Sequence, residues 1–110
     1  MSIRDAIVEE IQLLAQPSKQ LDYERSLTAA GDAPSELVTC FCDDLYHPKD
    51  ETFLSSFTSD ELRDLAHLYG LIVEASAAQF STVAEMLKDS KWRRVVEVAK
   101  QITPRFESAG

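Results

Sequence analysis

The sequence predicts an all-α protein: a compact single-domain bundle of five or six helices over residues 1–110. Only three glycines and four prolines interrupt the chain. The residues between them favour Ala, Leu, Glu, Lys, Gln and Arg, which lose little side-chain freedom in a helix. Apolar residues recur at spacings of three and four, the period of a helix with one buried face. Hydrophobic residues make up 45% and charged residues 27%, which is typical of one globular core.

Two helices are expected before residue 32. Ser2 can cap the first helix, and Pro17 ends it. Its buried face consists of Ile3, Ile7, Ile11 and Leu14. The second helix is expected to begin after Ser18 and to end at Ala30, because Gly31 is a typical helix stop.

A third helix begins around Pro34, which a first helical turn tolerates, and ends before Pro48. Its apolar positions are Leu37, Val38, Phe41, Cys42 and Leu45. Residues 47–56 are mostly polar, and we expect a surface loop anchored by Phe53 and Leu54.

The strongest local signal is a capping box at Thr58 and Glu61, followed by what we expect to be the longest helix. Phe57 can pack on Leu62 as a hydrophobic staple. The expected face of this helix is Leu62, Leu65, Tyr69, Ile72, Val73 and Ser76.

The last part of the chain repeats the capping signal at Thr82 and Glu85. Asp89 or Ser90 then starts a final helix, which Pro104 closes. The core predicted for the whole bundle is Ile7, Ile11, Leu37, Phe41, Leu45, Leu62, Leu65, Tyr69, Ile72, Trp92, Val95 and Ile102.

The net charge of −8 is unevenly distributed and excludes some functions. Fifteen acids and five Lys or Arg precede residue 77, whereas four acids and six Lys or Arg follow. Such a surface repels polyanions, so we expect no direct nucleic-acid binding. No apolar run approaches the roughly 20 residues that cross a bilayer, and no uninterrupted secretory signal begins the chain. A cytoplasmic location and no membrane association are therefore expected.

The two cysteines, Cys40 and Cys42, stand two apart in an expected helix, so their side chains diverge and cannot pair. Reduced thiols are expected, as in a reducing compartment. Cys40, Asp43, Asp44 and His47 fall at i, i+3, i+4 and i+7, a spacing that places potential zinc ligands on one helix face. Solvated carboxylates and a half-buried thiol explain the same pattern, and we predict no metal and no cofactor.

Sequence motifs for catalysis are absent. The chain has no nucleophile elbow, phosphate-binding loop or zinc-protease helix motif. Cys42 with His47 or His67 could form a thiol–imidazole pair, but no neighbouring residue marks it as activated. Four cations surround Trp92, namely Lys88, Lys91, Arg93 and Arg94. They could grip an anionic groove, or Trp92 could anchor the last helix while the cations reach solvent. We predict that the protein is not an enzyme.

The predicted binding site is an acidic segment that contains a tyrosine. Its residues are Asp43, Asp44, Tyr46, Asp50 and Glu51. An exposed tyrosine among carboxylates provides an anchor and steers a basic protein partner. The other interpretation is a solvated acidic face with Tyr46 half-buried.

In its acidity, small size and helical character, the chain resembles bacterial toxin-immunity proteins of the colicin or contact-dependent growth inhibition type. It departs from the colicin immunity proteins because it lacks their tyrosine pair and flanking pattern. The segment Phe-Cys-Asp-Asp-Leu-Tyr-His-Pro, followed by Phe-Thr-Ser-Asp-Glu-Leu, is also similar to uncharacterised small bacterial proteins. The resemblance implies an inhibitor that covers a basic site on a nuclease toxin.

Three functional hypotheses follow. The first is a non-enzymatic binding protein, an immunity protein or inhibitor with a basic partner. The alternative is a homo-oligomeric scaffold or regulatory adaptor, in which the helix after Thr58 pairs with its own copy as a homodimer. A more distant alternative is a small metal- or thiol-dependent enzyme based on Cys40, Cys42 and His47.

Overall fold

Helices account for the whole architecture of the described chain. The computed structural model describes residues 2–26 and 32–108, which form seven α-helices and one π-helix. In chain order they are α1 (Ile3–Leu14), α2 (Pro17–Ser26), α3 (Ala33–Thr39), the π-helix η1 (Cys40–Leu45), α4 (Glu51–Ser55), α5 (Ser59–Ser76), α6 (Val83–Met86) and α7 (Ser90–Ser108). The all-α, single-domain prediction is confirmed.

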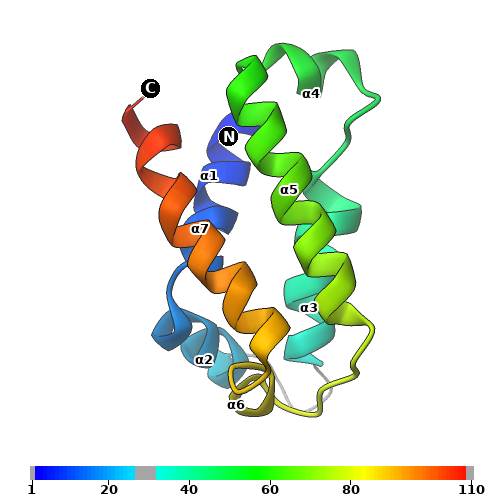
Figure 1. The fold of residues 1–110 in the computed structure, drawn as a ribbon, viewed down its shortest axis with the longest axis vertical. Helices are drawn as coiled ribbons and strands as arrows, with labels where there is room; N and C mark the ends of the chain where they lie inside the picture. Colours follow the sequence, from blue (N-terminus) through cyan, green and yellow to red (C-terminus); the bar gives the residue numbers. More distant parts are fainter. Residues whose placement is uncertain (1, 27–31, 109–110) are drawn as a thin grey trace.

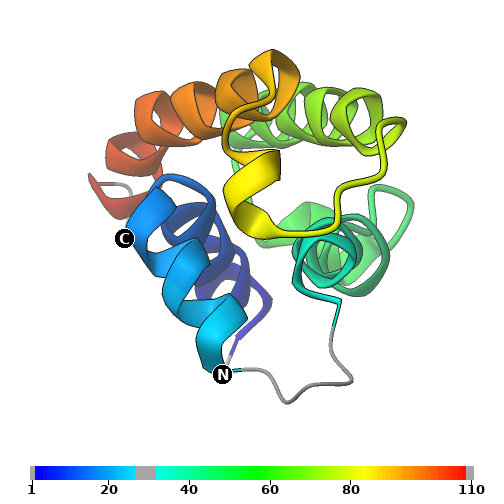
Figure 2. The same cartoon turned by 90° about the horizontal axis from the view of Figure 1, so that it is seen from below.

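The helices form two layers (Figure 1 and Figure 2). In one layer α5 and α7 lie side by side, and in the other α1 lies beside the continuous segment formed by α3 and η1. The short helices α2 and α6 lie at one end of the bundle, and α4 lies at the opposite end. Both α1 and α5 pack against α7, so α7 connects the two layers.

Side-chain caps begin the helices where the sequence places them. The predicted capping box is present: Thr58 Oγ1 accepts from the backbone N–H of Glu61 at 3.2 Å, and Glu61 Oε1 accepts from the N–H of Thr58 at 2.9 Å. Ser2 and Thr82 likewise accept from backbone N–H groups of α1 and α6. These bonds satisfy donors that a helix start leaves without partners.

Trp92 is fully buried and ties three helices together. Its Nε1–H donates to Gln20 Oε1 at 3.0 Å, and the Gln20 amide donates to the carbonyl of Leu14 at 3.0 Å. The contact joins α7 to α2 and to the end of α1. Trp92 is therefore a core residue, as the second of the two interpretations expected, and the cations beside it reach the surface.

A second tie holds the opposite end of the bundle. Arg4 on α1 makes two hydrogen bonds to the buried carboxylate of Glu61, at 2.8 and 2.6 Å. Its guanidinium also donates to the carbonyl of Phe106 at 3.0 Å and lies over the rings of Phe57 and Phe106. One side chain thus fixes the starts of α1 and α5 against the end of α7.

Three element boundaries differ from the sequence-based predictions. Residues 51–55 form α4 instead of a loop, because Asp50 caps this turn and Phe53 is buried. Pro17 begins α2, a position where proline fits because its missing N–H would have no partner. The expected end of that helix at Ala30 and its stop at Gly31 lie outside the described residues.

Pro104 does not close the last helix, which continues to Ser108. Proline inside a helix costs about 3 kcal/mol. Burial of Phe106 and the hydrogen bond from Arg4 to its carbonyl offset that cost. With 19 residues, α7 is therefore longer than the 18-residue α5, which was expected to be the longest helix.

The buried face of α5 is turned relative to the prediction. Its buried residues are Glu61, Leu65, Leu68, Ile72 and Ala75. Tyr69 is 36% exposed and Val73 45% exposed, while Leu62 is only partly buried. Both sets of positions follow a helical period, so the pattern cannot choose between them. Pairing with Arg4 allows the Glu61 carboxylate to occupy a buried position.

The rest of the core follows the prediction with one exception and several additions. Leu45 was expected inside and is only partly buried. Phe53 is buried, as expected of an anchor, whereas Leu54, the other expected anchor, is exposed; Leu68, Val83, Met86 and Phe106 are buried although they were not predicted to be. Within the described residues, no helix is long and apolar enough to cross a bilayer.

Candidate partner-binding surface

The predicted site residues lie at the end of η1 and in the turn that follows it. We call Asp43, Asp44, Tyr46, Asp50 and Glu51 the acidic surface. Asp43 and Asp44 belong to η1, Tyr46 follows directly, and Asp50 and Glu51 begin α4. The surface therefore spans a π-helix, a turn and a helix start.

The π-helical turn is set by residues on either side of it. The N–H of Tyr46 donates to the carbonyl of Phe41 at 2.9 Å, which is the five-residue hydrogen bond of a π-helix. His47 Nε2 donates to the carbonyl of Asp44 at 2.9 Å. Pro48 disfavours a helical conformation at the residue before it, so the helix ends here. Such single π-turns occur often at functional sites.

Asp50 combines a structural role with exposure. Its Oδ1 accepts from the N–H groups of Thr52 at 2.8 Å and Phe53 at 3.3 Å, which caps α4. The side chain is nevertheless exposed, as is Glu51 beside it. The negative charges at this helix start are stabilised by the positive end of the helix dipole.

The carboxylates of the acidic surface are exposed and lack ion pairs within the described residues. In contrast, Glu61 pairs with Arg4, Asp22 with Arg25, Asp60 with Arg63 and Asp64 with Arg105, at distances of 2.6 to 3.9 Å. Lys49 lies within the same segment but forms no such pair in the described chain. The negative charge of this surface is therefore not neutralised internally.

Tyr46 is half-buried, which corrects the expectation of an exposed tyrosine anchor. Its ring stacks on Phe41 with centroids 5.6 Å apart and meets Phe53 edge-on at 5.6 Å. Tyr69 packs on it at 4.9 Å and is the more exposed of the two tyrosines. Burial and the neighbouring Tyr69 raise the pKa of the Tyr46 hydroxyl. The aromatic edge available to a partner is thus shared between Tyr46 and Tyr69.

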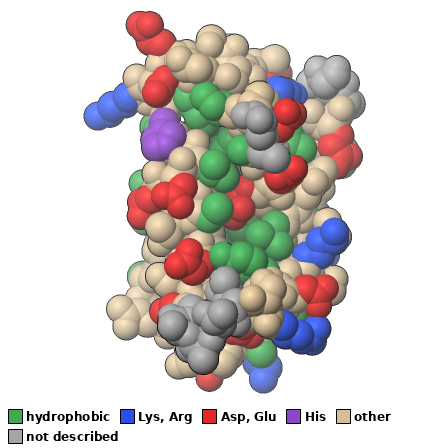
Figure 3. Space-filling model, turned by 180° about the vertical axis from the view of Figure 1, so that it is seen from behind, with side chains coloured by type: hydrophobic (Ala, Val, Ile, Leu, Met, Phe, Trp, Pro, Cys, Tyr) green, Lys and Arg blue, Asp and Glu red, His purple; other side chains and the backbone are tan. Residues whose placement is uncertain are grey.

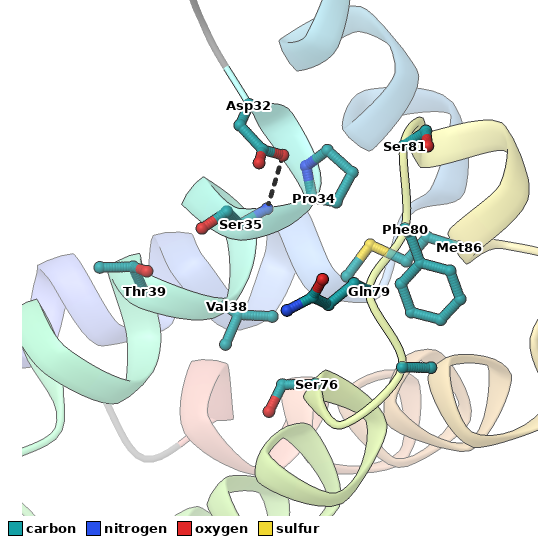
Figure 4. Close-up of a pocket in the computed structure, with 11 residues that line it drawn as sticks. Asp32, Pro34, Ser35, Val38, Thr39, Ser76, Gln79, Phe80, Ser81 and Met86 are labelled. Atoms are coloured by element: carbon teal, nitrogen blue, oxygen red, sulfur yellow. Dashed lines mark hydrogen bonds between the residues drawn. The ribbon is translucent and has the colours of Figure 1, made fainter.

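Several hollows open on the surface of the described chain, and two of them border η1 or α3. One, of about 510 Å³, is formed by residues 46–50 and lies within the acidic surface. The other, of about 670 Å³, lies between α3 and the segment that joins α5 to α6 (Figure 4). Its lining mixes hydroxyl and amide groups with Val38, Phe80 and Met86, and Asp32 at its edge caps α3 by accepting from the N–H of Ser35.

Beneath the acidic surface, Glu10 of α1 is buried against η1. Only 6% of Glu10 is exposed. Its Oε2 accepts from the Cys40 thiol at 3.5 Å, while Oε1 has no hydrogen-bond partner. Burial raises the pKa of this carboxyl to about 7, and the Cys40 hydrogen bond lowers it slightly. Glu10 is the most unusual titratable group described in this region.

The two cysteines have little thiolate character. Burial, together with nearby carboxylates, raises the pKa of Cys40 to about 12 and that of Cys42 to about 11. A nucleophilic cysteine needs the opposite shift. Both thiols are free, as expected for reduced cysteines.

The potential zinc ligands do not come together as their spacing suggested. The π-turn changes the angular spacing, so Cys40 contacts Glu10 while Asp43 and Asp44 are exposed. Across residues 2–26 and 32–108, no three His, Cys, Asp or Glu side chains are arranged to hold a metal ion.

Comparisons with protein families, with curated proteins and with solved structures find no match for this chain.

Sequence reasoning missed Glu10 and Tyr69 as parts of this region. Glu10 lies three residues after Ile7 and next to Ile11, on the apolar face of α1, so a helical projection could have indicated its burial. Tyr69 was assigned to the core because its spacing fits a helical face. The packing of α5 instead leaves it at the edge of the acidic surface.

Proposed function

We propose that the chain is a non-enzymatic binding protein whose acidic surface holds a basic protein partner. The observation that carries this proposal is the clustering of charge: the four carboxylates of the acidic surface fall within residues 43–51, are exposed, and have no ion-pair partner in the described chain. Charges left without internal partners can steer and orient a cationic surface.

Apolar contact area accompanies the negative charge. Seen from behind, hydrophobic side chains run along the layer that contains α1 and η1, with acidic side chains on both sides of them (Figure 3). The acidic surface also has an exposed aromatic side chain at its edge, Tyr69, and a hollow at residues 46–50. Binding surfaces typically combine such an apolar centre with a charged rim.

An immunity protein or inhibitor is the most specific form of this proposal. A basic nuclease toxin carries its positive charge where it meets nucleic acid, and a compact acidic protein can cover that site. A cytoplasmic location fits this role. Affinity would then come from close contact at the aromatic edge, while the carboxylates would set the rate of association.

A pair of charge-reversal variants tests the proposal. Asp43→Lys with Asp44→Lys reverses the charge of η1, and Glu74→Lys with Glu97→Lys makes the same change in charge at exposed positions of α5 and α7. Immobilised protein is used to capture partners from a bacterial lysate at low salt. We expect the first variant to lose a partner that the wild type and the second variant retain. Equal loss in both variants, or no salt-sensitive partner at all, contradicts the proposal.

Self-association is the second candidate function, and the exposed face of α5 favours it. Tyr69 and Val73 are large apolar residues at the surface, and Ala66, Gly70 and Ala77 lie along the same helical face. A second copy could pack there. Light scattering over a hundredfold concentration range measures the mass of the protein in solution, with Val73→Lys as the control. A constant monomer mass excludes self-association.

A further inference from the structure

The seam between α1 and η1 contains a buried acid without a counter-ion. Only 6% of the Glu10 surface is exposed, yet its Oε1 has no hydrogen-bond partner. Within the described residues, no lysine or arginine lies within ion-pair distance of it. A carboxylate in such a place is costly when charged and tolerable when protonated.

The groups that face Glu10 are themselves acids. Cys40 and Cys42 approach it from η1 and Tyr23 approaches it from α2, and Glu36 of α3 lies close enough to act on both Cys40 and Tyr23. The charged side chains of α7, which also packs against α1, are all exposed. On α1 itself, Arg4 is engaged by Glu61 at the far end of the helix. Of these groups only the Cys40 thiol, through its hydrogen bond to Oε2, favours an ionised Glu10, and burial outweighs it.

The other side of the seam carries the acidic surface. Cys40, which donates to Glu10, is the first residue of the same π-helix that presents Asp43 and Asp44 to solvent. π-helices are rare and occur mostly as single turns within α-helical segments, often at functional sites. A charge buried on its inner side is costly because it loses its contact with water, and this desolvation is the main cause of the raised pKa of Glu10.

We infer that Glu10 is a proton-dependent latch between α1 and η1. When its carboxyl is protonated, η1 packs on α1 and the acidic surface has a fixed shape. When the carboxyl ionises, the seam opens to hydrate the charge and η1 loosens. The consequence for a partner rests on the proposed function, because it assumes that Asp43 and Asp44 bind that partner.

The direction of the effect follows from where the proton binds. The carboxyl titrates near its ordinary pKa of 4.5 when the seam is open and at about 7 when it is closed. The closed state therefore binds the proton more tightly, and opening becomes more favourable as the pH rises from 4.5 to 7. Above pH 7 the Glu10 carboxyl is ionised in both states, so the opening equilibrium no longer depends on pH.

Amide hydrogen exchange of the isolated protein tests the latch. After correction for intrinsic exchange rates, we expect the protection of η1 amides, including Tyr46, to fall more than tenfold between pH 5 and pH 8. Glu10→Gln should abolish this dependence, and Glu9→Gln, a change at the exposed neighbour, should leave it in place. Amides in the middle of α5, away from the seam, should keep their protection.

Three results overturn the inference. The first is an unchanged pH dependence in Glu10→Gln. The second is an equal loss of protection in α5, which means that Glu10 acts on global unfolding instead of the seam. If Glu10→Gln fails to fold, carboxyl ¹³C NMR of the wild type replaces it. There the Glu10 carboxyl and the η1 amides must titrate with one midpoint near pH 7, and separate midpoints are the third contrary result.

The latch and the proposed function can fail independently. Exchange is measured without a partner, so a flat pH profile removes the latch and leaves partner capture unaffected. Conversely, a failure to capture any basic partner removes the proposed function while the exchange profile still reports on the seam. If both hold, the partner should dissociate faster from the wild type at pH 8 than at pH 5, and this difference should shrink in Glu10→Gln.

Discussion

Two glutamates of this protein are buried to nearly the same extent and have opposite electrostatic roles. Glu61 is 4% exposed and Glu10 is 6% exposed. Arg4 and the Thr58 cap provide hydrogen bonds that lower the pKa of Glu61, whereas burial without a cation raises the pKa of Glu10 to about 7. Burial alone does not determine whether a carboxyl is charged; the hydrogen-bond donors around it do.

The two sites divide the bundle into a tied end and a loosely held seam. At the tied end, Nη1 and Nη2 of Arg4 donate to acceptors from α5, α7 and the end of α4. At the seam, a weak thiol donor is the main partner of Glu10. The predicted site lies above the seam, so the part of the surface proposed to bind a partner rests on the less satisfied of the two sites.

Breaking the tied end should have the largest effect. Arg4→Met keeps an apolar stem against Phe57 and Phe106 but leaves the Glu61 carboxylate buried without its cation. We expect a loss of about 3 kcal/mol in the free energy of unfolding, since removing one partner of a buried pair strands the other charge. Urea denaturation at pH 7 measures it. Arg25→Met, which breaks the exposed pair with Asp22, should cost less than about 1 kcal/mol, and equal losses would contradict the comparison.

Replacing Glu10 or Glu61 by glutamine should change the free energy of unfolding in opposite directions. Because the pKa of Glu10 is raised in the folded state, its contribution to the free energy of unfolding is fully present below pH 4.5. This contribution is lost as the pH rises to about 7. Glu10→Gln should therefore stabilise the protein at pH 8, by less than the roughly 3 kcal/mol of a fully buried charge because opening of the seam hydrates the wild-type carboxylate, and have little effect at pH 4.

Glu61→Gln should show the reverse behaviour. Its lowered pKa contributes stability above pH 4.5, which is lost as the pH falls through the folded-state value. This variant should be destabilised at pH 7 and approach the wild type in acid. Thermal unfolding between pH 3 and pH 8 compares the two variants, and shifts of the same sign at pH 8 would count against the assigned charge states.

The thiols beside Glu10 offer a chemical probe of the closed seam. At pH 6, where Glu10 is protonated and the seam is closed, a pKa of about 11 for Cys42 and about 12 for Cys40 leaves few thiolates. We expect alkylation by iodoacetamide to be about a hundredfold slower than in the urea-unfolded chain. Mass spectrometry over time measures the rate, and modification as fast as in the unfolded chain would show that the seam is open.

The smallest effect on stability is expected at the acidic surface itself. Asp43→Asn with Asp44→Asn removes exposed charges that have no ion pair in the described chain. The free energy of unfolding should change by no more than about 0.5 kcal/mol. A large loss of stability would show that these carboxylates serve the fold and would weaken the case for a partner.

The sequence determined the helices and most of their starts. Thr58 with Glu61, Ser2, Asp32 and Thr82 are local signals, because a cap bonds to N–H groups within three residues. It also determined the acidity of residues 43–51 and the burial of Trp92. What it could not determine was that α7 continues past Pro104 to Ser108. That continuation depends on the burial of Phe106 and on its bond to Arg4, which links residues about a hundred positions apart.

The tertiary structure alone decided which face of α5 is buried. On α5, two sets of residues fit the helical period equally well, and packing selected Leu68 over Tyr69. It also decided the charges of Glu10 and Glu61, since their partners Cys40 and Arg4 come from other helices. Helical periods and caps are local properties that a sequence displays directly, whereas burial and pKa depend on residues that folding brings together from distant parts of the chain.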